Sequence, residues 1–251
     1  MMARAIAATT TALAAFTALV LTGAMTGIDE WAVDHVMPAL DPTSGQKGIV
    51  QTTGLWRPFP LRIVWWQKLI DGYNYPASVL VSAVIVAAAV VVLVRHGRGR
   101  AALVWVGAWC AANAVELFGK YVITRPAVYW TNGVRHVHLI PFDNSYPSGH
   151  TERSVVLAAI VAYAWPRVRG AAAVWVALVP VSLVVGAAHT VSDVVGGMLV
   201  GLLLVLAAHA MIGRWTQSPA FSSASSGASW AIRSPFSRTS RARASSSPTG
   251  S

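Results

Sequence analysis

The sequence is poor in charged residues and in cysteine. Only 11% of its 251 residues are charged, whereas an ordinary soluble domain carries about 25%. This shortage excludes a typical soluble enzyme and, for the main body of the chain, disorder. The single cysteine, Cys110, allows no internal disulfide bond and no cysteine metal cluster. The chain is instead 55% hydrophobic, with a mean hydropathy of +0.55, which is typical of a membrane protein.

The formal net charge of +10 does not predict a nucleic-acid partner. The basic residues lie between apolar stretches and in the C-terminal tail, and they form no contiguous basic face. The tail, residues 214–251, is rich in Ser with scattered Arg and Pro. This composition predicts a disordered cytoplasmic tail. Its arginines either contact anionic lipid headgroups or have no specific task.

Long apolar stretches recur along the chain. Because a helix needs about 20 apolar residues to cross the bilayer core, they predict an all-α polytopic membrane domain of about six helices in a bundle. This domain covers residues 1–213. The expected spans are residues 6–25, 76–94, 101–118, 154–165, 171–188 and 194–212. The first stretch also fits a cleaved secretory signal, with Arg4 before it and small residues near Gly23, although we favour a retained helix.

The distribution of arginine predicts the orientation of these spans. With the N-terminus inside, the short inner loops receive clusters such as Arg95, Arg98 and Arg100, while the acidic residues fall on the outer side. Because positive short loops mark the cytoplasmic side, we expect a plasma-membrane protein with both termini in the cytoplasm. Two outer loops follow: residues 26–75, with short amphipathic helices on the membrane surface, and residues 119–150.

Three polar segments interrupt the apolar pattern, each at the outer end of a predicted helix. They are residues 119–126 (GKYVITRP), 146–151 (YPSGHT) and 189–193 (HTVSD). The topology places all three at the same depth. Polar residues at such a place in a membrane bundle are functional candidates.

The histidines of these segments suit acid–base and nucleophilic chemistry. His189 and Asp193 are four residues apart, so on a helix they would share a face and the carboxylate could fix the imidazole tautomer. An imidazole held in this way is a nucleophile or a base. Ser148 and Gly149 open a helix whose N-terminus suits an anion. His150 could then give a proton to a leaving oxygen.

Two cations complete the set. Lys120 and Arg125 carry donors that suit phosphate oxygens. Together with the histidines, the carboxylate and the helix N-terminus, they suit phosphoryl transfer, which depends on charge neutralisation and positioning. Each segment alone also fits a structural role, as a helix-end pair, a helix cap or a membrane-edge anchor. Their shared depth favours the joint functional interpretation.

The order of the three segments resembles that of the type 2 phosphatidic acid phosphatase (PAP2) superfamily of membrane lipid phosphatases. The family pattern is K-x6-R-P, then P-S-G-H, then S-R-x5-H-x3-D, and the resemblance covers about residues 70–213. It implies that His189 is a nucleophile that forms a phosphohistidine. It also implies that Asp193 orients this histidine and that His150 is the general acid.

For phosphate binding, the resemblance implies Lys120 together with the turn Ser148–Gly149, and no metal or other cofactor. The first motif departs from the family, because Lys120 and Arg125 form K-x4-R-P and Ala127 stands where the family has its arginine. We keep Lys120 in register and expect Arg125 to serve nearby. Glu116, four residues before Lys120, either orients that lysine or forms an ordinary helix-end pair.

The third motif also departs from the family, because Leu183 replaces its arginine. By analogy with an oxyanion-hole donor, losing one such donor can cost about 3–4 kcal/mol of transition-state stabilisation. Arg153 and Arg135 are candidates to compensate, although Arg153 fits a membrane-edge anchor equally well. If the clamp is merely incomplete, Leu183→Arg should raise turnover. His136-x-His138 alternates as in a strand, but no third metal ligand is evident near it.

The leading interpretation is an integral membrane phosphatase, a phosphoric monoester or diphosphate hydrolase whose substrate is a lipid phosphate or pyrophosphate. A polyprenyl pyrophosphate such as undecaprenyl pyrophosphate, a phosphatidate, a phosphatidylglycerophosphate and a glycosylated polyprenyl phosphate all fit. Two alternatives stay open. One is a lipid phosphotransferase, in which an alcohol resolves the phosphohistidine. The other is a catalytically weak or silent lipid-binding protein that kept the scaffold. The oligomeric state is not predicted.

Overall fold

The computed structural model describes residues 1–36, 72–123, 127–131, 134–138, 144–186 and 188–216. The chain divides into two compact units, Met1–Gly213 and Arg214–Ser251. Most of the predicted outer loop 26–75 lies outside the described residues, and so does the tail beyond residue 216, for which disorder was predicted.

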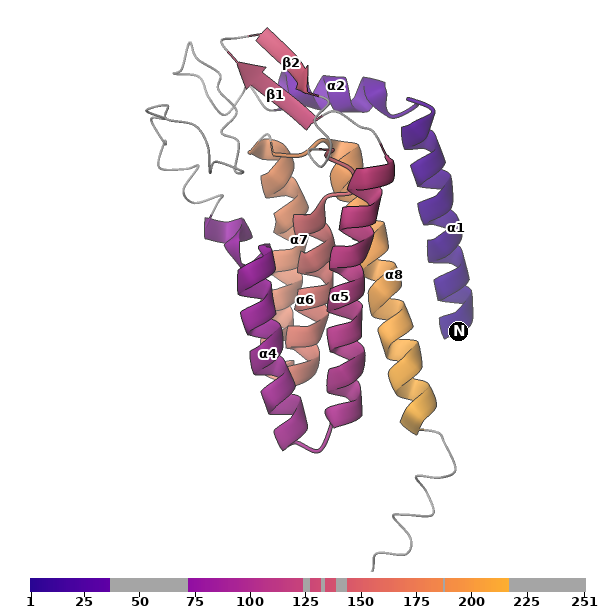
Figure 1. Ribbon diagram of the computed structural model, residues 1–251, viewed down its shortest axis with the longest axis vertical. Helices are drawn as coiled ribbons and strands as arrows, with labels where there is room; N and C mark the ends of the chain where they lie inside the picture. Colours follow the sequence, from indigo (N-terminus) through magenta and orange to yellow (C-terminus); the bar gives the residue numbers. More distant parts are fainter. Residues whose placement is uncertain (37–71, 124–126, 132–133, 139–143, 187, 217–251) are drawn as a thin grey trace, which may run out of the picture. The chain divides into compact units, whose positions relative to one another are not determined.

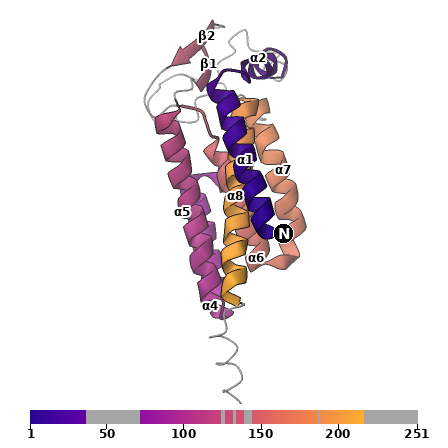
Figure 2. The same ribbon diagram turned by 90° about the vertical axis from the view of Figure 1, so that its right-hand side faces the viewer.

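Long helices dominate the first unit (Figures 1 and 2). In chain order they are α1 (Met2–Leu21), α4 (Val79–Arg95), α5 (Gly99–Val122), α6 (Gly149–Ala164), α7 (Arg169–Val185) and α8 (Val191–Thr216). Each overlaps one of the predicted spans, and Figure 2 shows them running along a common direction. The prediction of an all-α polytopic membrane protein is confirmed. Within the described ranges, α1, α5, α8 and the stretch Pro166–Val185 are long and apolar enough to cross a membrane, and α4 is a shorter apolar helix.

Short elements lie between the long helices. The helix α2 (Thr26–His35) occupies the start of the predicted outer loop, and the 3-10 helices η2 (Tyr75–Ala77) and η3 (Pro166–Val168) precede α4 and α7. Between α5 and α6, β1 (Ala127–Thr131) and β2 (Val134–His138) form an antiparallel pair in which Val128 lies opposite Val137. This hairpin is a small addition to the predicted helical architecture (Figure 1).

The start of α6 agrees with the motif and not with the hydropathy. Hydropathy predicts this span at residues 154–165, whereas the motif predicts that Ser148 and Gly149 open a helix. The helix begins at Gly149, with Ser148 as its N-cap. Its first turns are polar, and Thr151, Glu152 and Arg153 are nevertheless buried. Hydropathy misses this part of the helix because its polar side chains face the protein and not the lipid.

Close packing brings α8 against α6. A Cβ atom at Gly197 would press on the carbonyl oxygen of Ser148, and one at Gly201 would press on Val155 and on the carbonyl oxygen of Glu152. Small residues let membrane helices approach closely, and packing rather than hydrophobic burial then holds them, because lipid tails are themselves apolar. The glycines of α8 therefore place its first turn beside the first turn of α6.

Candidate active site

The described parts of the three polar segments, residues 119–123, 146–151 and 189–193, converge where α5 ends and α6 and α8 begin, which we call the site end of the bundle. The residues before α6 tie these helices together. Asn144 Nδ2 donates to the carbonyl oxygen of Lys120 at 2.6 Å, and Ser145 Oγ donates to Asp193 Oδ1 at 3.1 Å. The backbone N–H of Ser148 donates to the carbonyl oxygen of Asp193 at 3.0 Å.

A reciprocal pair of hydrogen bonds starts α8. Thr190 N donates to Asp193 Oδ2 at 3.0 Å, and Asp193 N donates to Thr190 Oγ1 at 3.4 Å. This is the geometry of a capping box, with an aspartate in the place of the usual glutamate. The helix begins at Val191, so His189 precedes it, and the expectation that His189 and Asp193 share a helix face is wrong. The capping box still brings the two residues together.

The imidazole of His189 faces the Asp193 carboxylate without a hydrogen bond. Its Nδ1 lies 3.7 Å from Asp193 Oδ2, which allows electrostatic attraction but is too long for a hydrogen bond. Asp193 is fully buried, whereas 12% of the His189 side chain is exposed. The carboxylate is therefore fixed by its other partners, and the histidine keeps contact with the surroundings.

A second carboxylate, from α2, supports the start of α8. The buried Asp29 accepts hydrogen bonds from the backbone N–H of Ser192 at 3.0 Å and from its hydroxyl at 2.6 Å. A negative charge is favourable at a helix N-terminus. Asp29 and Ser192 are 163 residues apart, and no spacing or motif in the sequence pairs them.

The start of α6 combines a helix cap with a close approach of a carboxylate. Ser148 is fully buried, and its Oγ accepts hydrogen bonds from the N–H of Thr151 at 3.5 Å and from the Thr151 hydroxyl at 3.1 Å. Ser148 is thus a helix cap. A Cβ atom at Gly149 would overlap the carboxylate of Glu116, so only glycine fits this position without a shift. Among the described residues, the N–H groups of Gly149 and His150 have no acceptor, as expected in a first helical turn.

Glu116 joins two cations at the site end. Its carboxylate lies 2.9 Å from Lys120 Nζ and also pairs with Arg153 Nη1. Arg153 Nε donates to the carbonyl oxygen of Ala77 at 2.7 Å. Only 3% of the Arg153 side chain is exposed, so the interpretation of Arg153 as a membrane-edge anchor is wrong. The pairing of Glu116 with Lys120 agrees with both hypotheses, and Glu116 also pairs with Arg153.

The backbone places His150 near His189. His150 is the second residue of α6, and the N-cap of that helix, Ser148, donates its N–H to the carbonyl oxygen of Asp193, whose carboxylate faces His189. The two histidines therefore lie at adjoining helix starts.

The structure gives Leu183 a packing role and adds Glu152, which the sequence analysis did not single out. Leu183 is 4% exposed and packs with Val179 and Val194, so its side chain belongs to an apolar cluster. Its carbonyl oxygen accepts the N–H of His189 at 3.2 Å, so the backbone at this position helps to place the histidine. Glu152 is fully buried, and neither of its carboxylate oxygens has a hydrogen-bond partner in the described part of the chain. In the sequence, only the polar residues around Glu152 at the start of α6 indicated that this residue could belong to the site.

The remaining candidates cannot be placed in the site. Arg125 lies outside the described residues, and Arg135 lies in β2, where its side chain is also outside them. The same holds for the side chains of His136 and His138. Within the described ranges, no group of three or more His, Cys, Asp or Glu residues could hold a metal ion.

Fold and site together define a polytopic helical membrane protein with a histidine-containing polar site between its helix ends. Residues 101–217 match the sequence model of the PAP2 superfamily. This stretch runs from α5 to the end of α8 and contains all three motifs. This match confirms the resemblance to the PAP2 superfamily that the motifs indicated.

The fold is also similar to a solved structure. The crystal structure of a transmembrane PAP2 type phosphatidylglycerolphosphate phosphatase from Bacillus subtilis superposes with a TM-score of 0.57 at 16% sequence identity. The superposition covers 83% of this chain and 96% of the other. A search of curated protein sequences finds no match.

Proposed function

We propose that the protein is a membrane phosphatase that hydrolyses a lipid phosphate or pyrophosphate through a phosphohistidine on His189. The observation that supports this most is the position of His150, His189 and Asp193 at the same end of the bundle as Lys120 and Arg153. Phosphoryl transfer needs this combination of a nucleophile, a proton donor and fixed positive charge. The match of residues 101–217 to the PAP2 superfamily model supports the same reaction class.

In the proposed reaction, His189 attacks phosphorus with its Nε2, because its Nδ1 faces Asp193. The bond from phosphorus to the leaving oxygen breaks, and His150 gives that oxygen a proton. The leaving group is a lipid alcohol from a phosphate ester, or a lipid phosphate from a pyrophosphate. Water then attacks the phosphohistidine and gives its proton to His150. His189 leaves as a neutral imidazole, and inorganic phosphate is released.

Positive charge for the phosphoryl oxygens comes from Lys120 and from the free N–H groups at the start of α6. Arg153 is the described cation that best replaces the third-motif arginine, because it lies beside Lys120 through their common partner Glu116. The turn Ser148–Gly149 contributes through its backbone, since the Ser148 hydroxyl caps the helix. No step of this scheme uses a metal ion.

The substrate is proposed at the level of a lipid phosphate. The named function of the structurally similar Bacillus subtilis protein supports phosphatidylglycerophosphate as the first candidate. Phosphatidate and undecaprenyl pyrophosphate also carry a terminal phosphoryl group on a lipid, so they belong in the same test. From the arginine distribution we propose that the site end faces outward from the plasma membrane and that both termini are cytoplasmic.

The test is phosphate release by the purified protein in detergent from each of these three lipids. We expect release from at least one lipid and its loss in His189→Ala. His96→Ala is the matched control, because His96 is an exposed histidine at the end of α4 remote from the motifs, and it should keep wild-type activity. Equal release by the wild type and His189→Ala would remove the phosphatase proposal. Transfer of phosphate to an added alcohol, seen by mass spectrometry, would favour a phosphotransferase.

A further inference from the structure

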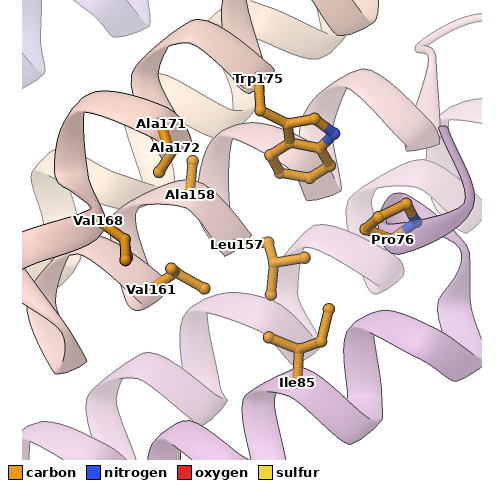
Figure 3. Close-up of a pocket in the computed structure, with 9 residues that line it drawn as sticks. All are labelled: Pro76, Ile85, Leu157, Ala158, Val161, Val168, Ala171, Ala172 and Trp175. Atoms are coloured by element: carbon orange, nitrogen blue, oxygen red, sulfur yellow. The ribbon is translucent and has the colours of Figure 1, made fainter. Parts of the chain in front are cut away.

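An apolar groove lies among α4, α6 and α7, away from the charged residues of the site. Its volume is about 280 Å³, and its lining also includes residues of η2 and η3. Figure 3 shows the side chains of Leu157, Ile85 and Trp175 around this space, with the small side chains of Ala158 and Ala172 on another side. Each residue that lines the groove is apolar.

The groove begins about one helical turn along α6 from the charged cluster. Arg153, Leu157 and Val161 follow one another at intervals of four residues on α6, so they lie on one face of that helix. Leu157 and Val161 line the groove, whereas Arg153 pairs with Glu116 one helical turn earlier. Each interval of four residues corresponds to about 6 Å along the helix.

A second connection joins the groove to the same arginine. Pro76 lines the groove, and the carbonyl oxygen of the next residue, Ala77, accepts the hydrogen bond from Arg153 Nε. The residues that line the groove are thus neighbours of the cationic cluster along two different elements, α6 and η2.

Hydrogen bonds beside the groove fix the position of Trp175, one of its lining residues. The hydroxyl of Tyr73 donates to the carbonyl oxygen of Trp175 at 2.8 Å, and Trp175 Nε1 donates to the carbonyl oxygen of Tyr73 at 3.1 Å. Ser182 Oγ donates to Asn74 Oδ1 at 3.1 Å about two turns further along α7. These bonds fasten the chain before η2 to α7. The indole of Trp175 is therefore fixed where it lines the groove.

We propose that this groove takes the hydrocarbon tail of the substrate lipid and makes the enzyme select among substrates by their tails; the inference rests on the proposed function. A lipid phosphate has a charged end and an apolar chain in the same order as Arg153 and the groove beneath it. The groove lies along apolar helices, so a chain can enter it without leaving an apolar environment. Ala158 and Ala172 determine its width, because larger side chains at these positions would fill it.

The decisive variant is Ala158→Leu, assayed with a long-chain phosphatidate and with its dihexanoyl analogue. We expect kcat/KM for the long-chain substrate to fall at least about tenfold, chiefly through KM, because apolar pockets discriminate by factors of about 10–200. The short-chain substrate should be processed as by the wild type. Ala173→Leu is the matched control, since Ala173 is exposed on α7 and does not line the groove. Equal losses with both substrates, or no loss with either, would overturn the tail groove.

A binding experiment separates failure of the groove from failure of the proposed function. A long-chain phosphatidate with a diazirine in mid-chain should label the peptides of α6 and α7 that contain Ala158 and Ala172. Ala158→Leu should abolish this labelling, and the same probe without its phosphate should label more weakly. Labelling elsewhere, or labelling that does not depend on the phosphate, would show that only bulk lipid occupies the groove. Absence of phosphate release with correct labelling would contradict the phosphatase and not the groove.

Discussion

Asp193 Oδ2 accepts the N–H of Thr190 at 3.0 Å and lies 3.7 Å from Nδ1 of His189. One carboxylate oxygen thus starts a helix and faces the proposed nucleophile. We predict that Asp193→Asn lowers kcat by about 10²–10⁴-fold, because an amide neither holds the same tautomer nor stabilises a positive imidazole. The measurement is phosphate release at saturating lipid.

Thr190→Ala separates the two roles of this carboxylate. It removes the cap acceptor of the Asp193 N–H and should cost about 1 kcal/mol of stability, while the carboxylate stays beside His189. Its kcat should stay close to that of the wild type. A loss of kcat as large as that of Asp193→Asn would mean that the aspartate acts only as part of the cap.

The buried pair of Glu116 and Arg153 should be strongly coupled. Glu116→Gln leaves the buried Arg153 without its countercharge and should lower the free energy of unfolding by about 3–5 kcal/mol. Adding Arg153→Met should recover much of this loss, because no unpaired charge then remains buried. Unfolding of the single and double variants in detergent gives the coupling energy, and additive losses would contradict the pairing.

A side chain at Gly149 should displace the Glu116 carboxylate from its ion pairs with Lys120 and Arg153. A Cβ atom there would overlap the Glu116 carboxylate, so Gly149→Ala should destabilise the protein by about 1–3 kcal/mol and reduce activity. Gly107→Ala in α5 is the matched control, because a Cβ atom there has no atom within 4 Å. That control should be neutral or stabilising by about 0.5–1 kcal/mol. Equal behaviour of the two variants in thermal unfolding and turnover would contradict the contact.

The structure reverses the expectation for Leu183→Arg. Because Leu183 packs with Val179 and Val194, an arginine there would be buried without a partner, and both stability and turnover should fall. Leu183→Met should cost less than about 1.5 kcal/mol, since it conserves volume. A gain in turnover for Leu183→Arg would show that its side chain reaches the phosphate instead.

Phosphate release should continue in the presence of EDTA, because the proposed reaction uses only histidines, a carboxylate and cationic side chains. The control is the same preparation after EDTA is removed and Mg²⁺ or Mn²⁺ is added. Loss of activity with EDTA and its return with the metal would contradict the mechanism.

The sequence alone determined the positions of the long helices and the order of the three motifs. Both are local properties: the length of an apolar stretch decides whether a helix can span a membrane, and polar residues mark helix ends. The spacing of Thr190 and Asp193 also fits a capping box, which the predictions missed because they considered His189 as part of the helix. Hydropathy alone places the start of α6 too late, because it does not distinguish polar side chains that face the protein from those that face outward, whereas the motif at Ser148–Gly149 predicts the start correctly.

Only the tertiary structure decided which partners these residues have. The pairing of Arg153 with Glu116, the support of Ser192 by Asp29 and the groove below Arg153 join residues that lie far apart in the chain. Such contacts depend on how closely helices approach, and here the glycines of α8 determine that distance. Apolar patterning is the same for many arrangements of the same helices. Side-chain packing between helices selects one arrangement, and that arrangement makes the site.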